Sequence, residues 1–371
     1  MPIDLTNSVL YHSGKFPPKQ LDYNSIIAPL TGATNALSRY DQMLKNLHNS
    51  AILSAPLRNQ EAVLTSRMEG TISTLDEILQ YEAENLDSDK DSTRSDIIET
   101  LLYQRALNKT QKSMEEGRPL SPFLLRSAHQ VLLSFGRGFD KNPGQFKIEQ
   151  NYLSDKSKKN ILFTPVSPEH LQSGLDELFS YIVSNPEIAL IKVAVAHIEF
   201  EALHPFKDGN GRIGRMLITL MLWSLGLISE PHFYMSHYLE ENKDLYIDTM
   251  RNVSKNNDWS AWCVFFLTAV EKQAVRNLEV AEQITTLYEE MKEPFSQVLS
   301  SKWSIKVLDF VFTNPIFKNN GLSKKCSIPP QSAARFTKEL LKADLIKTVI
   351  KPSGRRGTMY SFEPLLELVR V

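Results

Sequence analysis

The chain has 371 residues, of which 42% are hydrophobic and 23% charged, with a formal net charge of -1. This length predicts two or three domains of an ordinary globular protein, and the near-neutral charge argues against a strong overall field for nucleic acid or membrane. The two cysteines, Cys263 and Cys326, lie too far apart for a metal motif, which together with the absence of a signal-peptide pattern predicts a cytoplasmic protein without a disulfide framework.

The N-terminal third begins irregularly and then turns helical. Residues 1 to about 30 contain several prolines, whereas apolar residues recur at three- and four-residue spacing over 35–82. Gly70 and Thr71 interrupt this pattern, since glycine can end one helix and threonine can cap the next. The polar stretch 84–93 predicts a solvated loop.

The middle of the chain predicts more helices around one hairpin. Helices are expected over 95–116 and from Ser121 and Pro122 to about residue 135, with Ser121 as the N-cap. Residues 143–166 have short extended segments around a charged centre, which predicts a β-hairpin. Further helices are expected over 168–183, 188–204, 211–225, 241–254 and 259–291. The longest apolar run, 216–227, is too short to span a bilayer, so no membrane contact is expected.

The sequence changes character after Pro294. Residues 304–312 and 331–343 predict helices, and 345–350 and 358–362 predict two strands joined by the basic turn KPSGRRG. Helices followed by a small hairpin are typical of a winged-helix module. We therefore expect three domains: an N-terminal helical region over 1–92, a catalytic core over 93–293 and a winged-helix-like domain over 294–371.

The segment HPFKDGNGRIGR, residues 204–215, carries the chemistry. Gly209 and Gly211 let the backbone turn sharply and approach a ligand, and the following helix directs its positive end at the same place, which favours phosphate. Arg212 and Arg215 lie three residues apart on one helical face, where both can bracket phosphate oxygens. A base, a carboxylate and a phosphate cradle together indicate phosphate-transfer chemistry.

Two groups in this segment supply the remaining roles. Asp208 is a hard oxygen ligand of the kind that Mg²⁺ prefers beside a nucleotide. His204 has an unperturbed pKa near neutrality and is the natural general base. A lone histidine after an apolar helix is more often structural, and His197 on the same helix keeps that structural interpretation.

The segment resembles the Fic signature, and all its fixed positions are filled. The resemblance implies a mainly α-helical Fic core in which His204 deprotonates a target hydroxyl, Asp208 holds Mg²⁺ and Phe206 anchors the loop. It also implies that the nucleotide phosphates are gripped by the following residues: Gly209, Asn210, Gly211, Arg212 and Arg215. The implied reaction is attack of a Ser, Thr or Tyr hydroxyl on the α-phosphate of ATP, with AMP transferred to a target protein or to the enzyme itself and pyrophosphate released.

The resemblance extends to the hairpin and to the segment after the motif. PGQFK and the hairpin up to Pro165 resemble the family's flap, which aligns an extended target segment by strand pairing. On this analogy Asn160, Ile161 and Leu162 lie beside the nucleotide and the target. Tyr238 and Tyr246 either stack on adenine or pack the domain, and both interpretations stay open.

A second signal, LTSRMEGT over residues 64–71, resembles the family's inhibitory helix. Thr65, Glu69 and Gly70 fit its pattern, which implies that Glu69 pairs with Arg215 and keeps it from the nucleotide γ-phosphate. On its own, Glu69 would be an ordinary surface glutamate near a helix end.

Other functions remain open. The same motif could transfer another phosphate-containing group or remove AMP, with Glu69 orienting a water molecule. The basic residues of the C-terminal module, Lys324, Lys325, Arg335, Lys338, Arg355 and Arg356, could make the chain a nucleotide-sensing regulator that binds DNA. We favour a solvated interaction face, because Glu339, Asp344 and Glu363 dilute this charge. The chain could also form a homodimer.

Overall fold

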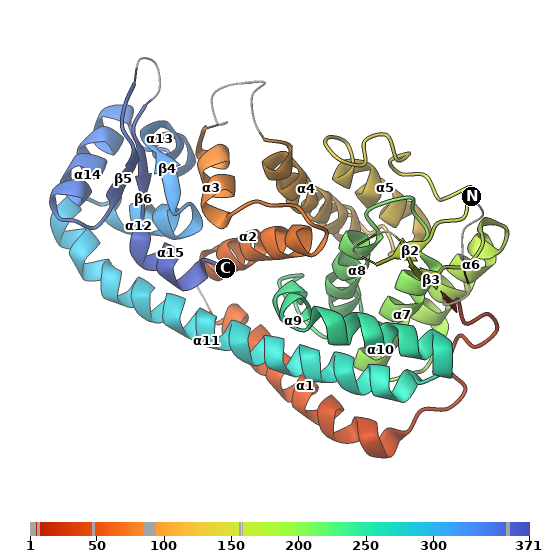
Figure 1. The fold of residues 1–371 in the computed structure, drawn as a ribbon. Helices are drawn as coiled ribbons and strands as arrows, with labels where there is room; N and C mark the ends of the chain where they lie inside the picture. Colours follow the sequence, from red (N-terminus) through yellow and green to blue (C-terminus); the bar gives the residue numbers. More distant parts are fainter. Residues whose placement is uncertain are drawn as a thin grey trace.

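The computed structural model describes residues 5, 8–46, 49–84, 94–155, 157, 159–353 and 357–371, and this portion of the chain is mostly helical (Figure 1). The expected loop over 84–93 lies outside the described residues except for Glu84, which belongs to a helix. No helix among the described residues has both the length and the apolarity needed to cross a bilayer.

The first third of the chain forms five helices that surround the site. They are α1 (Tyr23–Lys45), α2 (Ala51–Met68), α3 (Leu75–Glu84), α4 (Ser95–Glu115) and α5 (Pro122–Leu132). Ser121 caps α5 as predicted, with its side chain accepting a hydrogen bond from the Leu124 N–H. Gly70 ends the α2 region with a φ of 84°, but the next helix is capped by Thr74 and not by Thr71. Thr74 and Glu77 bond to each other's backbone N–H groups, which makes a capping box.

The centre of the molecule is built on two consecutive helices. In chain order its elements are α6 (Pro168–Ser184), α7 (Ala189–Leu203), α8 (Asn210–Ser224), α9 (Ser236–Glu241) and α10 (Lys243–Asn256). Almost every side chain of α7 and α8 is buried, which explains why these two segments are largely apolar apart from the polar first turns of α8. Helix α8 contacts four other helices: α2, α4, α5 and α7. The start of α8 therefore lies where these helices meet.

A long helix joins this core to the C-terminal region. Helix α11 (Trp259–Leu299) spans 41 residues, or about 60 Å, and α1 packs along it (Figure 1). The expected end at residue 291 is wrong, and the irregular start of the chain ends earlier than expected, because α1 already begins at Tyr23. Pro294 lies inside α11, where burial of Phe295 against Phe362 stabilises the last turn. The expected domain boundary at 293/294 therefore falls within a helix.

The C-terminal region forms a compact unit on the end of α11. Its elements are α12 (Ser304–Thr313), β4 (Ile316–Lys318), α13 (Asn319–Cys326), α14 (Pro330–Lys342), β5 (Lys347–Ile350), β6 (Met359–Ser361) and α15 (Glu363–Val369). Its three strands form an antiparallel sheet in the order β4-β6-β5. The sequence pattern predicted α12, α14 and the β5–β6 hairpin but missed β4, α13 and α15, which are short. Residues 354–356 of the basic turn lie outside the described residues.

The predicted hairpin is present as β2 (Leu153–Ser154) and β3 (Ile161–Thr164), which pair antiparallel. A third strand, β1 (Val9–Leu10), was not predicted. It pairs in parallel with β3, so that the sheet order is β1-β3-β2. One edge of β3 is therefore covered by the chain itself, and β2 carries the free edge of the hairpin.

Candidate active site

The loop between α7 and α8 has a tightly fixed backbone. His204 ends α7 in the left-handed region with a φ of 47°, which costs about 1–2 kcal/mol for a residue with a Cβ. Gly209 adopts the same region immediately before α8. The side chain of Asn210 accepts from the Phe206 N–H at 2.8 Å and donates to the Phe206 carbonyl at 2.8 Å. Asn210 thus closes the loop, and its side chain is occupied there.

His204 is held as a neutral base. Its Nδ1 lies 3.3 Å from the carbonyl oxygen of Glu201, and since a carbonyl only accepts, Nδ1 carries the proton and Nε2 the lone pair. Burial, with the charge of Lys147 adding to it, lowers the pKa of His204 to about 4. At neutral pH the imidazole is therefore unprotonated, and Nε2 carries the lone pair that a general base needs.

Arg212 is a buried cation with unmet donors. It is 4% exposed, and its Nε and Nη1 find no hydrogen-bond partner among the described residues. Its nearest carboxylate, Asp208, is 3.9 Å away. Donors left unpaired in a buried site cost free energy, so an anion at this position would be stabilised. The first backbone N–H groups of α8 point to the same end of the helix, because the first helical bond runs from Ile213 to Gly209.

Arg215, in contrast, is fully engaged by α2. Its Nε donates to Oγ1 of Thr65 at 2.7 Å and its Nη2 to the Thr65 carbonyl at 3.0 Å. The same Nη2 lies 2.7 Å from Oε1 of Glu69. Burial alone would raise the pKa of Glu69, but the adjacent Arg215 outweighs it and holds that pKa below its usual range. The pair of Glu69 with Arg215 is thus present as the resemblance implied, and Thr65 bonds to the same arginine.

Gly211 makes this approach of Glu69 feasible. A Cβ added at residue 211 would lie 2.5 Å from Oε1 of Glu69 and 2.9 Å from Nη1 of Arg215. The carboxylate therefore lies directly against the first turn of α8. Gly214 has a matching role in the next turn of the helix, because a Cβ there would collide with the carboxylate of Glu201.

Asp208 lies at the open side of the loop. Its side chain is 42% exposed, and Oδ1 accepts from the Gly209 N–H at 2.5 Å. The described residues contain no group of three or more His, Cys, Asp or Glu side chains that could hold a metal ion. A single carboxylate fits Mg²⁺ only where phosphate oxygens and water complete the coordination, which is the usual arrangement of that ion beside a nucleotide.

His129 supports the loop from α5 and was not predicted. Its Nε2 donates to the Asp208 carbonyl at 2.9 Å, and its Nδ1 accepts from the Gly144 N–H at 2.8 Å. Its ring stacks on Phe206 with centroids 3.8 Å apart and planes 7° apart. Burial lowers the pKa of His129 to about 4, so it stays neutral, as this pair of bonds requires. A lone histidine on an amphipathic helix gives no signal in sequence that could have identified it.

Two residues of the flap segment that precede β2, Lys147 and Asn151, hold the loop from the other side, and the sequence did not reveal this role either. Asn151 donates to the carbonyls of His204 and Phe206 at 3.1 and 3.0 Å. The Nζ of Lys147 donates to the Leu203 carbonyl and to Oδ1 of Asn151, both at 2.9 Å. Burial lowers the pKa of Lys147 to about 7. The approach to the flap and the motif therefore form one hydrogen-bonded unit.

The flap residues lie over an apolar cavity of about 170 Å³ between β2, β3, α7 and α10. Leu162 lines it, together with Glu201, Ile247 and Met250. Ile161 begins β3, and Asn160 bonds to the Asp155 carboxylate within the hairpin turn. Of the three predicted flap residues, Leu162 is thus the one that faces a ligand-sized space.

The two tyrosines differ. Tyr246 is 4% exposed, its hydroxyl lies 2.8 Å from Nε2 of His197, and its ring packs against Trp262 and Phe265. It belongs to the core beneath the site, and this packing favours the structural interpretation. Tyr238 is half-buried and contacts Phe265 at the start of α9, so its hydroxyl end is more accessible than that of Tyr246.

Sequence comparisons place two family matches on this architecture. Residues 27–112 match the Fic/DOC family N-terminal domain and residues 119–222 match the Fic/DOC family. The chain is 34% identical over 125 residues to protein adenylyltransferase fic-1 of Caenorhabditis elegans, covering 33% of this chain and 23% of that protein. It is 27% identical over 112 residues to probable protein adenylyltransferase aq_aa38 of Aquifex aeolicus, covering 30% of this chain and 32% of that protein.

A third relative carries a different name. The chain is 28% identical over 140 residues to uridine 5'-monophosphate transferase of Xanthomonas campestris pv. campestris, covering 35% of this chain and 26% of that protein. The chain therefore matches less than a third of the length of each of these three relatives.

Solved structures share the fold over much more of the chain. A Fic family protein from Desulfovibrio desulfuricans G20 superimposes with a TM-score of 0.61 at 17% identity, covering 93% of this chain and 98% of that one. Fic-1 from C. elegans superimposes with a TM-score of 0.54 at 18% identity, covering 70% of this chain and 75% of that one.

Proposed function

The chain belongs to the Fic/DOC family, and we propose that it transfers AMP from ATP to hydroxyl side chains of proteins, itself included. Two of its relatives are named protein adenylyltransferases, which supports the choice of nucleotide. One observation carries the proposal: the same loop and helix start hold a neutral histidine, His204, and a buried arginine, Arg212, whose Nε and Nη1 have no partner among the described residues.

In the proposed reaction the phosphates of ATP bind the end of α8. The unpartnered Nε and Nη1 of Arg212 and the backbone N–H groups of the first turn donate to phosphate oxygens. Asp208 would hold Mg²⁺, which neutralises charge on the phosphates when it is bound. The apolar cavity beneath Leu162 would take the base, since its volume of about 170 Å³ suits one heterocycle.

The transfer itself needs one proton acceptor. The target hydroxyl gives its proton to Nε2 of His204 while its oxygen forms a bond to the α-phosphorus. The bond from that phosphorus to the bridging oxygen breaks, and pyrophosphate leaves with the electron pair. The protein contributes position and charge rather than a covalent intermediate, as is usual for phosphate-group transfer.

The target segment would pair with the free edge of β2. The opposite edge of the hairpin, on β3, is already paired with β1. Strand pairing reads extended backbone, so Ser, Thr and Tyr hydroxyls can all be presented.

Glu69 would restrain the enzyme. It holds Arg215 at 2.7 Å and lies against Gly211, so that the triphosphate loses a cation and meets a negative charge. We also assign the C-terminal region a winged-helix fold, which the order of its helices and antiparallel strands supports, with a solvated interaction face rather than a DNA-binding one.

UMP transfer is the second candidate, because one relative is named a uridine 5'-monophosphate transferase. The same base, carboxylate and phosphate cradle serve either nucleotide, so only the base pocket separates them. The test is to incubate the purified chain and a target lysate with ATP or with UTP and to measure the mass added to modified proteins. An AMP adduct supports the proposal, and a UMP adduct alone replaces it with the second candidate.

A further inference from the structure

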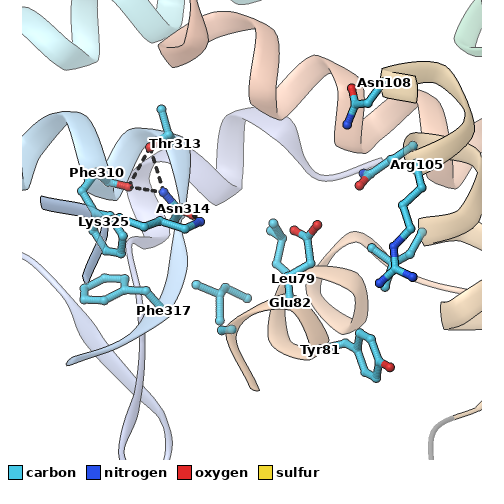
Figure 2. Close-up of a pocket in the computed structure, with 14 residues that line it drawn as sticks. Leu79, Tyr81, Glu82, Arg105, Asn108, Phe310, Thr313, Asn314, Phe317 and Lys325 are labelled. Atoms are coloured by element: carbon cyan, nitrogen blue, oxygen red, sulfur yellow. Dashed lines mark hydrogen bonds between the residues drawn. The ribbon is translucent and has the colours of Figure 1, made fainter. Parts of the chain in front are cut away.

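A second cavity, of about 340 Å³, lies far from the motif, between the N-terminal helices and the C-terminal region. Helices α3 and α4 form one wall, and α12, β4 and α13 form the other (Figure 2). Its floor is apolar and buried, with Leu79 at 4%, Phe310 at 4% and Phe317 at 1% exposure. The two phenylalanine rings meet edge to face with centroids 5.3 Å apart. The volume is in the range of small-molecule sites.

Charged groups of both signs surround this floor. Glu82 projects from α3 into the gap, Arg105 comes from α4, and Lys325 comes from α13 (Figure 2). Glu82 is exposed at the rim of the cavity, and partial desolvation beside the wall raises the pKa of its carboxyl although Lys325 and Arg105 act against it. Among the described residues, the Glu82 carboxylate makes no hydrogen bond and no ion pair. Arg105 likewise has no hydrogen bond there, and Lys325 bonds only to Oδ1 of Asn314, at 2.5 Å.

Two amides add directional groups. Asn108 uses its Oδ1 to accept from Arg58, and Gln104 uses its Nε2 to donate to Asn59. Both residues line the cavity, and among the described residues the opposite ends of their amides, Nδ2 of Asn108 and Oε1 of Gln104, have no hydrogen-bond partner. The cavity thus offers a carboxylate, two cations and a free amide donor and acceptor over an apolar floor.

We propose that this cavity binds a small zwitterion with an apolar side chain, of the size of an α-amino acid or a dipeptide. A purely anionic ligand would leave Glu82 unmatched, and a purely cationic one would face Arg105 and Lys325. A zwitterion places its ammonium on Glu82, its carboxylate on the cations and its side chain on Phe310 and Phe317. Glu82, Arg105 and Lys325 are exposed at the rim of the cavity, so their contacts would be charge-assisted hydrogen bonds at a partly hydrated rim, with the buried apolar floor beneath them.

One wall of the cavity, α3, is connected through a short segment to Glu69. Helix α3 follows Glu69 after residues 70–74, and Ser73 in that connection bonds to Thr100 of α4 at 2.9 Å. Arg370, beyond α15, pairs with Asp76 of α3 at 2.9 Å. A ligand that bridges the two walls therefore fixes α3 where Glu69 meets Arg215. This regulatory consequence rests on the proposed function, whereas the binding site does not.

The probes are L-leucine and L-phenylalanine, with 4-methylpentanoate and 3-methylbutylamine as analogues that each lack one charge of leucine. Calorimetry on the full chain without nucleotide should show binding of the zwitterions and at least about tenfold weaker binding of both analogues. Glu82→Gln and Arg105→Gln should each lose a similar factor. Lys112→Gln, two turns further along α4 and outside the cavity, is the charge-matched control and should bind as the parent does.

Two results would overturn the site: no probe binds, or Glu82→Gln and Arg105→Gln bind leucine as well as Lys112→Gln does. The regulatory consequence has its own readout. Leucine should lower self-modification by the parent and leave a Glu69→Gln variant unchanged, and binding without any such effect would refute the coupling while the site stands. Because binding is measured without nucleotide, its result does not depend on whether AMP transfer occurs.

Discussion

Oε1 of Glu69 lies 2.7 Å from Nη2 of Arg215, across 146 positions of the chain. The arginine is almost fully buried, whereas the glutamate side chain is 35% exposed. Thr65 accepts the remaining strong bonds of the guanidinium. Removing Glu69 would therefore free one donor of Arg215, while the two bonds to Thr65 would still hold the buried guanidinium.

Glu69→Gln should raise self-modification, because it removes the negative charge beside α8 and keeps helix propensity. A coupling of about 1–3 kcal/mol between the carboxylate and ATP predicts an increase of about 5- to 150-fold. Glu69→Gly should do the same, and Arg215→Ala added to either should cancel the gain. Transfer of labelled AMP from ATP to the chain measures it, and parent-level labelling of both single variants would make LTSRMEGT an ordinary helix end.

Asp208→Ala should weaken the Mg²⁺ dependence of ATP binding and lower transfer severely. The described residues contain no group of three or more His, Cys, Asp or Glu side chains that could hold the ion. Binding of Mg²⁺ should therefore depend on the Asp208 carboxylate and on the phosphates. Asp208→Asn is the matched control, since it keeps an oxygen ligand and the bond to the Gly209 N–H. A magnesium titration that is identical in Asp208→Ala and the parent would contradict the assignment.

His129 should act by positioning Asp208 rather than by touching substrate. His129→Leu leaves the Gly144 N–H and the Asp208 carbonyl unpaired, which costs about 1–3 kcal/mol for each group. We expect lower thermal stability and a weaker apparent affinity for Mg²⁺. His129→Asn, which can donate and accept, should partly restore the affinity for Mg²⁺. Equal magnesium affinity in the parent and His129→Leu would leave His129 with a purely structural role.

Buried histidines also predict how stability depends on pH. His129 and His197 have pKa values lowered to about 4 and about 3 by burial, against about 6.5 in an unfolded chain. The unfolded state therefore binds more protons, and stability should fall as the pH falls from about 6.5 towards 4. Denaturant titrations over this interval measure the slope. His129→Asn should make it shallower by about one proton, and an unchanged slope would contradict the assigned burial.

The sequence predicted the motif-bearing elements well because their signals are local. The apolar run of α7, the glycines of the loop and the cap of α5 each act over a few residues. What it missed depends on tertiary contacts: β1 forms only because β3 offers an edge, and Pro294 is tolerated inside α11 because Phe295 is buried on the C-terminal region.

The site shows the same division. His204, Asp208 and Arg212 were singled out by their residue types and spacing, whereas the Glu69 segment was singled out only by its resemblance to the family's inhibitory helix. His129, Lys147 and Asn151 were not, because each is brought to the loop from a distant segment and bonds to backbone atoms that carry no sequence signature. The sequence could not predict the burial of Tyr246 either, because the spacing of aromatic residues on α10 is compatible with core packing and with stacking on a base.

The central claim is that His204 catalyses AMP transfer that Glu69 restrains. Its most direct test is the intact mass of purified Glu69→Gln after incubation with ATP and Mg²⁺, compared with Glu69→Gln carrying His204→Ala. The account predicts an AMP adduct on the first protein and a loss of about 10²- to 10⁴-fold in its rate of formation on the second, with ATP binding retained. No adduct on Glu69→Gln, or equal rates for the two proteins, would contradict it.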